Sequence, residues 1–130
     1  MLSRTADHLF WMSRYTERAE NTARMLDVNY QTSLLPQSEA VAQLGWQGLL
    51  SISELLYSYK QRHGEIQARE VMDFMVKDES NPSSIMSCLS AARENARAVR
   101  GTLTTEVWET QNTTWLEVKR MIKTLSLIHI

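Results

Sequence analysis

The residues best suited to chemistry fall in two stretches that resemble each other. The first runs from Arg14 to Arg24 and the second from Ala92 to Arg100, and each contains Glu-Asn followed by small residues and an arginine. Ten polar side chains in these stretches are the candidate site residues: Glu17, Arg18, Glu20, Asn21, Arg24, Arg93, Glu94, Asn95, Arg97 and Arg100. Carboxylates, amides and arginines in such a group can form an ion-pair network, bind an anion or transfer a proton.

Helical spacing places these side chains on defined faces. At about 100° per residue, Arg14, Glu17, Asn21 and Arg24 fall on one side of a helix. The apolar stripe of this helix comprises Leu9, Met12, Tyr15, Ala19, Ala23, Leu26 and Tyr30, and most of it lies on the opposite side. Arg93, Arg97 and Arg100 follow i, i+4, i+7 spacing and form one ridge. Such polar faces are typical of a second, partly buried side of a helix.

The first interpretation is structural. Glu17 and Glu20 would pair with Arg93 or Arg97 between helices, and the amides of Asn21 and Asn95 would satisfy backbone groups. Exposed pairs of this kind contribute only about 0–1 kcal/mol each. If they are buried, the loss of one partner costs about 3–5 kcal/mol.

Two sharper interpretations remain open. Arg24, Arg93, Arg97 and Arg100 could bind a phosphate or carboxylate through bidentate guanidinium contacts. Glu17 could instead act as a general base, although no nucleophile or oxyanion hole is evident beside it. We therefore assign no catalytic residue.

Other kinds of site are not predicted. Helical di-metal sites use Glu-x-x-His pairs, but the residues three before the histidines are Thr5, Lys60 and Ser126. The sequence has no paired cysteines and no glycine-rich phosphate loop, so we expect no metal and no cofactor. Cys88 falls on an apolar helix side and is predicted to be a small core residue. Trp108 and Trp115 are also predicted to pack in the core.

Composition indicates one ordinary soluble domain. The 130 residues are 22% charged and 43% hydrophobic, with a net charge of −1 and a single cysteine. This charge balance, without basic residues interleaved with aromatics, argues against nucleic-acid binding. No apolar run approaches the ~20 residues that a membrane span needs. We expect a cytoplasmic protein that does not enter a membrane.

Apolar periodicity predicts an all-α antiparallel bundle of about five helices. The first should be capped by Ser3 or Thr5 and end near Leu35, before Pro36. The others are expected from Ser38 to a stop at His63-Gly64, around residues 66–75, from an Asn81 cap to about Leu103, and from about Thr105.

The last six residues, Leu125 to Ile130, interrupt this pattern and resemble the translation of a sequencing adaptor. We therefore expect a domain over residues 1–124 and a non-native tail over residues 125–130. A natural chain that continues past Thr124 would leave this domain incomplete and its apolar surface exposed, which predicts self-association.

Several stretches together resemble the bacterial alpha-E domain, an α-helical domain with a Glu-Arg motif. They are Met1–Ala6, Trp11–Tyr15, Glu17–Arg24, Asn81–Ile85, Ala92–Arg100 and Glu106–Glu109 with Asn112, and the resemblance covers residues 1 to about 124. Gly101 departs from it, because a helix former is expected there. The resemblance implies that the motif residues are the ten polar side chains named above.

The family is associated with ATP-grasp and transglutaminase-like proteins, which implies a part in peptide synthesis or modification. Our first functional hypothesis is a non-catalytic helical partner that docks an ATP-grasp ligase or its peptide substrate. A peptide-modifying enzyme that uses Glu17 with the arginine cluster is the alternative, and a purely structural bundle is the third.

Overall fold

The computed structural model describes the backbone of residues 2–128 and the side chains of residues 3–120, and all regular elements in this range are helices. They are α1 (Leu2–Ser33), α2 (Glu39–Ile52), α3 (Leu56–Arg62), α4 (Ala68–Val76), α5 (Ile85–Ala98) and α6 (Thr105–Ile128). The predicted all-α fold is confirmed, with six described helices in place of about five. No described helix is both long and apolar enough to cross a membrane.

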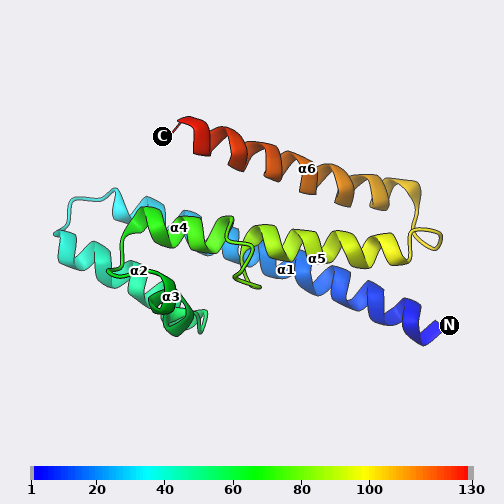
Figure 1. Ribbon diagram of the computed structural model, residues 1–130, viewed down its shortest axis with the longest axis horizontal. Coiled ribbons are helices and arrows are strands. Elements are labelled where there is room, and N and C mark those ends of the chain that lie inside the picture. Colours follow the sequence, from blue (N-terminus) through cyan, green and yellow to red (C-terminus); the bar gives the residue numbers. More distant parts are fainter. Residues whose placement is uncertain (1, 129–130) are drawn as a thin grey trace.

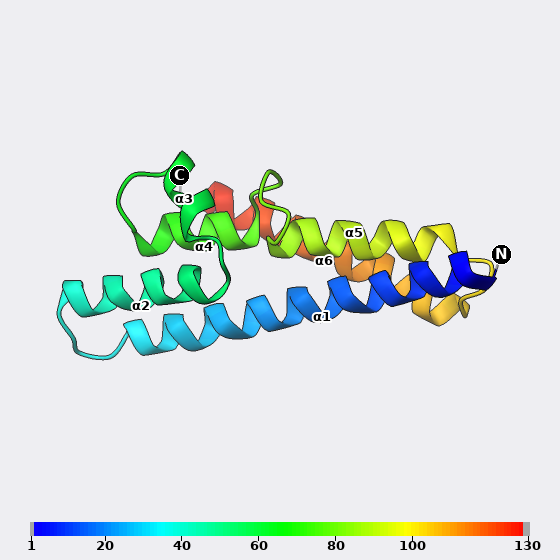
Figure 2. The same cartoon turned by 90° about the horizontal axis from the view of Figure 1, so that it is seen from below.

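Helix α1 is the axis of the molecule (Figures 1 and 2). The helices α4 and α5 follow one another along it in the opposite direction, while α2 lies beside only its C-terminal half. Helix α6 packs on α5 and runs back antiparallel to it. The most extensive packing is between α1 and α5, so these two helices position the polar stretches found in the sequence.

The core forms two clusters along α1. One gathers around Leu26, Leu50 and Phe74 where α1, α2 and α4 meet. The other contains Ala19, Cys88 and Leu89 between α1 and α5. The predicted apolar stripe of α1 is buried at Ala19 and Leu26 but is exposed at Ala23 and Tyr30.

The ends of α1 differ from the sequence prediction. Ser3 and Thr5 lie inside the helix, which begins by Leu2, and therefore do not cap it. The helix stops at Ser33, two residues before the predicted end at Leu35. The next residues continue as a tight turn, in which the backbone N–H of Leu34 donates to the carbonyl of Gln31.

The predicted helix from Ser38 to His63 is two helices. Ser38 caps α2 as expected, since its side chain accepts a hydrogen bond from the backbone N–H of Val41. The helix then ends in a Schellman motif, in which the N–H of Leu55 donates to the carbonyl of Leu50 at 2.8 Å. The residue in the left-handed position of this motif is Glu54, with φ of 60°.

The turn before α5 also differs from the prediction. The cap of α5 is Ser84, whose Oγ accepts from the N–H of Ser87, and not Asn81. Asn81 is buried instead, and its Nδ2 donates to the carbonyl of Phe74 near the end of α4. This side chain therefore ties the end of α4 to the turn that begins α5. Helix α5 stops at Ala98, before the predicted end near Leu103.

The ends of α3 and α6 are the remaining helix boundaries. Helix α3 ends at Arg62, which agrees with the stop predicted at His63-Gly64. The backbone of α6 stays helical through Ile128, past the expected domain boundary at Thr124. His129 and Ile130 lie outside the described residues, and the non-native origin of residues 125–130 stays a prediction.

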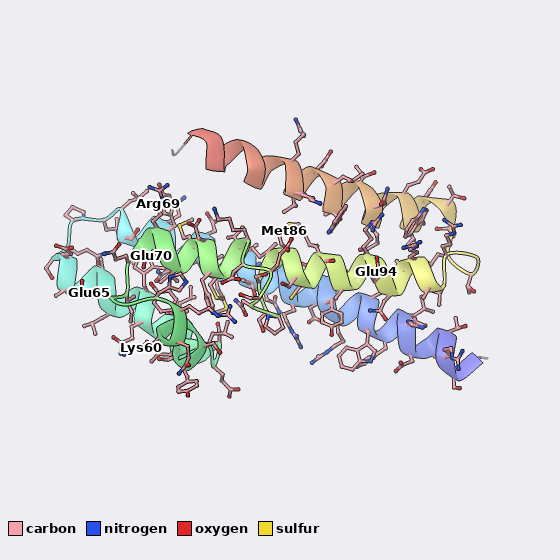
Figure 3. The ribbon with its side chains drawn as sticks, viewed as in Figure 1. Lys60, Glu65, Arg69, Glu70, Met86 and Glu94 are labelled. Atoms are coloured by element: carbon pink, nitrogen blue, oxygen red, sulfur yellow. The ribbon has the colours of Figure 1, made fainter. Side chains whose placement is uncertain are left out.

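Helix α3 is anchored by Tyr59, which is fully buried. Its hydroxyl lies 3.1 Å from the carbonyl oxygen of Glu65 and 3.4 Å from Oε2 of Glu70, and its ring stacks on His63. Burial raises the pKa of Tyr59, and the Glu70 carboxylate acts in the same direction, although a backbone hydrogen bond at Gln67 opposes them. Figure 3 shows Glu70 and its neighbour Glu65 close to the α2–α3 end of the molecule.

We expect Tyr59→Phe to lower the free energy of unfolding at neutral pH by about 1 kcal/mol, because a buried hydrogen bond is lost. The folded-state pKa of Tyr59 is raised, so its contribution is present below pH 10 and is lost as the pH rises through the folded-state value. Urea melts should therefore show a steeper alkaline loss in wild type than in Tyr59→Phe. The exposed Tyr57→Phe serves as control, and equal alkaline slopes in both variants would contradict the expectation.

Glu54→Gly should stabilise the protein. A left-handed conformation costs an ordinary residue about 1–2 kcal/mol, while glycine loses about 0.5–1 kcal/mol more backbone entropy on folding. We expect the free energy of unfolding, measured in urea melts, to rise by up to about 1.5 kcal/mol. The neighbouring Ser53→Gly, at φ of −80°, should destabilise instead. A destabilised Glu54→Gly protein would contradict this account of the turn.

Candidate functional site

The two polar stretches, one on α1 and the other on α5, lie at different levels along the packed pair of helices. The helices α1 and α5 are antiparallel, and Nδ1 of His8 lies 2.9 Å from Oδ1 of Asn95. By this register, Arg93 is level with residues 10–12 of α1. Arg24 is about 13 residues further along, which is roughly 20 Å at the helical rise. Arg24 and Arg93 therefore do not share one site.

The polar residues of the first stretch face outward from α1. Glu20 and Arg24 form an ion pair of 2.6 Å within the helix, with 62% and 69% of their side chains exposed. An exposed pair of this kind contributes at most about 1 kcal/mol. Glu17 is also exposed and lies two residues, about 200° around the helix, from the buried Ala19 that faces α5.

Asn21 and Arg24 line a groove between α1 and α2 with a volume of about 610 Å³. Its α2 wall is apolar and includes Leu44 and Ile52, which are 65% and 78% exposed. The two helices come close at Gly45, where a Cβ atom would lie only 3.2 Å from Oδ1 of Asn29. The groove thus combines an open apolar wall with a polar rim.

The second stretch makes a different set of contacts. Arg93 packs its guanidinium over the indole of Trp115, with Cζ 4.5 Å from the ring centroid, and its Nε donates to Oδ1 of Asn112 at 2.7 Å. Lys119 lies over the same ring at 4.7 Å. These contacts join α5 to α6, so Arg93 holds two helices together.

The rest of the arginine ridge does not converge on a common point. Arg97 is exposed and lies 4.0 Å from Glu94, which is also 3.6 Å from Arg93. Figure 3 labels Glu94 on α5. Arg100 is exposed beyond the end of α5. Asn95 donates to the carbonyl of Ala91 and meets His8, so its amide is used within the fold.

The predicted ion pairs between the helices are wrong for the side chains that the structure describes. Glu20 pairs with Arg24 on its own helix, while Arg93 and Arg97 pair with Glu94. Among the ten candidate side chains, Asn95 contacts His8 of α1 and Arg93 donates to Asn112 of α6. Sequence reasoning missed both, although Asn112 belongs to one of the stretches that carried the family resemblance.

Cys88 and Arg18 are the remaining side chains singled out in the sequence. Cys88 is fully buried, which confirms the core prediction, and burial raises the pKa of its thiol although the charge of Arg18 acts against this. Arg18 itself lies over the ring of Tyr15 at 5.5 Å. The described residues contain no group of three side chains that could hold a metal ion.

Arg93→Ala should lower the free energy of unfolding by about 1–3 kcal/mol, because it removes a partly buried hydrogen bond and a cation–π contact. Arg97→Ala is the matched control on the same ridge and should change stability by less than about 0.5 kcal/mol. Denaturant melts would test both. Equal losses in the two variants would contradict the distinct role of Arg93.

Comparison with known proteins supports the resemblance found in the sequence. A family model described as Alpha-E, a predicted alpha-helical domain with a conserved ER motif, matches residues 1–129. Neither the curated proteins nor the solved structures contain a significant match. In the adjacent pair Glu17-Arg18 of α1, Glu17 is exposed and Arg18 is half-buried. The chain belongs to the Alpha-E domain family.

Proposed function

We propose that this Alpha-E domain is a non-catalytic docking module for an ATP-grasp-type ligase of peptide synthesis or modification. The observation that carries the proposal is the groove between α1 and α2. Asn21 and Arg24, from the polar stretch of α1, stand on its rim, and exposed apolar residues of α2 form its wall. The association of the family with ATP-grasp proteins supplies the class of partner.

The chemistry of the groove suits a polypeptide segment. An amphipathic segment can place apolar side chains against Leu44 and Ile52. Its carbonyl or carboxylate oxygens can then accept hydrogen bonds from Asn21 or Arg24 on the rim. A small polar substrate would leave most of the apolar wall in contact with water, so a segment of the ligase is the better occupant.

A catalytic role has less support. General acid–base catalysis needs a proton-transferring group beside the reacting atoms and a donor for the developing charge. Glu17 is turned away from α5, and Arg93 is engaged with Trp115 and Asn112. The polar motif is better suited to contacts with a partner surface. Because the proposed partner consumes ATP, we also propose a cytoplasmic location for the module.

The test is binding to an ATP-grasp protein of the kind associated with the family, measured by isothermal titration calorimetry. Leu44→Glu puts a charge on the apolar wall and should weaken binding at least about tenfold, as expected for a central contact. Leu116→Glu on α6 is the control, because Leu116 is similarly exposed but remote from the groove.

Three results would count against the proposal. These are no binding by the wild-type domain, equal weakening by Leu44→Glu and Leu116→Glu, or turnover by the domain alone that Glu17→Gln abolishes. Circular dichroism would confirm that each variant remains helical. A transglutaminase-like protein of the kind associated with the family, titrated in parallel, would show whether binding is selective for the ATP-grasp partner.

A further inference from the structure

The N-terminal half of α1 carries a surface of aromatic and arginine side chains, which we call the aromatic–arginine face; three of its side chains are exposed and two, Tyr15 and Arg18, are half-buried. Its members are Phe10, Trp11, Arg14, Tyr15 and Arg18, so basic and aromatic residues do interleave on this helix, contrary to the expectation from the sequence. Phe10 is 55% exposed and meets Trp11 edge to face, with ring centroids 5.2 Å apart. Trp11 in turn lies 5.7 Å from Tyr15. Three neighbouring aromatic rings on one helix form an apolar surface that remains partly in contact with water.

The two arginines of this face are held by rings and not by carboxylates. Arg14 lies over Phe10 at 5.9 Å, and Arg18 lies over Tyr15 at 5.5 Å. No ion pair joins either guanidinium to an acidic side chain among residues 3–120, whereas Arg24 on the same helix is paired with Glu20. The cation–π contacts orient both guanidinium groups but leave their hydrogen-bond donors available to an anion.

The position of α2 explains why no other helix covers the aromatic–arginine face on this side of α1. Gly45 of α2 lies against Asn29 of α1, and Ile52 ends α2 near Asn21. Figure 2 shows that α2 accompanies only the C-terminal half of α1, and the chain then turns away into α3. The aromatic–arginine face lies beyond this point, as an extension of the side of α1 that α2 covers.

We propose that the aromatic–arginine face binds an acidic amphipathic helix of a partner protein. Phe10, Arg14 and Arg18 follow i, i+4, i+8 spacing, so they form a row about 12 Å long. A partner helix with carboxylates at i, i+4 spacing can pair with both arginines. Its leucine-type side chains can then cover Phe10 and Trp11.

The composition of the face agrees with a protein interface. Tryptophan, tyrosine and arginine are the residues most enriched among binding hot spots, and here they occur together on one rigid helix. Their rings and guanidinium groups are already packed against one another, which lowers the entropy lost on binding. This surface is distinct from the α1–α2 groove, and the inference stands whether or not the groove binds a ligase.

An anionic membrane is the competing occupant, and the charges on α1 disfavour it. Recognition of anionic lipids depends on clusters of about 4–8 basic residues. The aromatic–arginine face has two, and the exposed carboxylates of Asp7 and Glu17 flank it. A folded partner can place its own charges to avoid these carboxylates, but a lipid surface cannot.

The experiment uses two synthetic helical peptides of about 16 residues with the same leucine face, one flanked by glutamates and the other by lysines. Each is titrated into the full chain at low salt, and tryptophan fluorescence is recorded. We expect the acidic peptide to bind and the basic one to bind at least about tenfold more weakly. The double variant Arg14→Glu/Arg18→Glu should reverse this preference.

A matched double reversal at exposed residues elsewhere, Lys60→Glu/Arg120→Glu, should leave the preference for the acidic peptide unchanged. Phe10→Ser should weaken the acidic peptide without reversing the preference, and circular dichroism would confirm that all variants fold. Failure of the acidic peptide to bind, or equal effects of the two double reversals, would overturn the proposal.

Two parallel measurements test the other occupants. Light scattering that shows self-association of the wild type, lost in Arg14→Glu/Arg18→Glu, would assign the face to a second copy of this chain and overturn the proposal. So would co-sedimentation with phosphatidylglycerol vesicles that depends on the same arginines. A protein that stays monomeric and free of vesicles while it binds the acidic peptide supports the inference.

Discussion

The close packing of α1 against α5 is the constraint on which the rest of the structure depends. Helix α5 contributes Cys88, Ala92 and Ala96, all fully buried, and α1 contributes Ala19. Small side chains at a helix contact allow the two backbones to come close together. The contact between His8 and Asn95 sets the register at one end of the pair, while Cys88 and Leu89 meet Ala19 further along. Because α4 continues the line of α5 and α6 packs on it, this register also positions the remaining helices.

The same register separates the two halves of the polar motif. The two helices run in opposite directions, so Glu20 to Arg24 and Arg93 to Arg100 lie toward opposite ends of their contact. The first group stays on the surface, with an exposed ion pair that contributes little stability. In the second, Arg93 binds Asn112 and covers Trp115, which makes it part of the α5–α6 contact. The two similar sequences therefore have different roles in the fold: Asn95 and Arg93 of the second stretch contact neighbouring helices, whereas Glu20 and Arg24 pair with each other on the surface of α1.

The sequence predicts the all-α fold, the burial of Cys88 and the family, because helical periodicity and the motif stretches are local signals. It does not predict the division of α2 from α3, since the turn has neither proline nor glycine and places Glu54 in a left-handed conformation. Asn81-Pro82 has the pattern of a helix start, yet the side chain of Asn81 donates a hydrogen bond to the carbonyl of Phe74, and Ser84 caps α5 instead. The pairing of charges was missed for a further reason. Periodicity gives the face of each helix, but the offset between two helices depends on long-range packing such as the contact of His8 with Asn95.

The turn at Glu54 links the fold to both candidate interaction surfaces. If α2 continued straight past Ile52, its next turns would cover the side of α1 that carries Arg14 and Arg18. The Schellman motif instead ends the helix there, and the chain returns to the core at Tyr59. The left-handed conformation of Glu54 is costly for a residue with a side chain, and such backbone strain is found where surrounding structure requires it. Here it limits α2 to the part of α1 that forms the groove and leaves the aromatic–arginine face open. The turn at Glu54, which hydrophobic periodicity does not predict, thus determines which parts of α1 remain available to a partner.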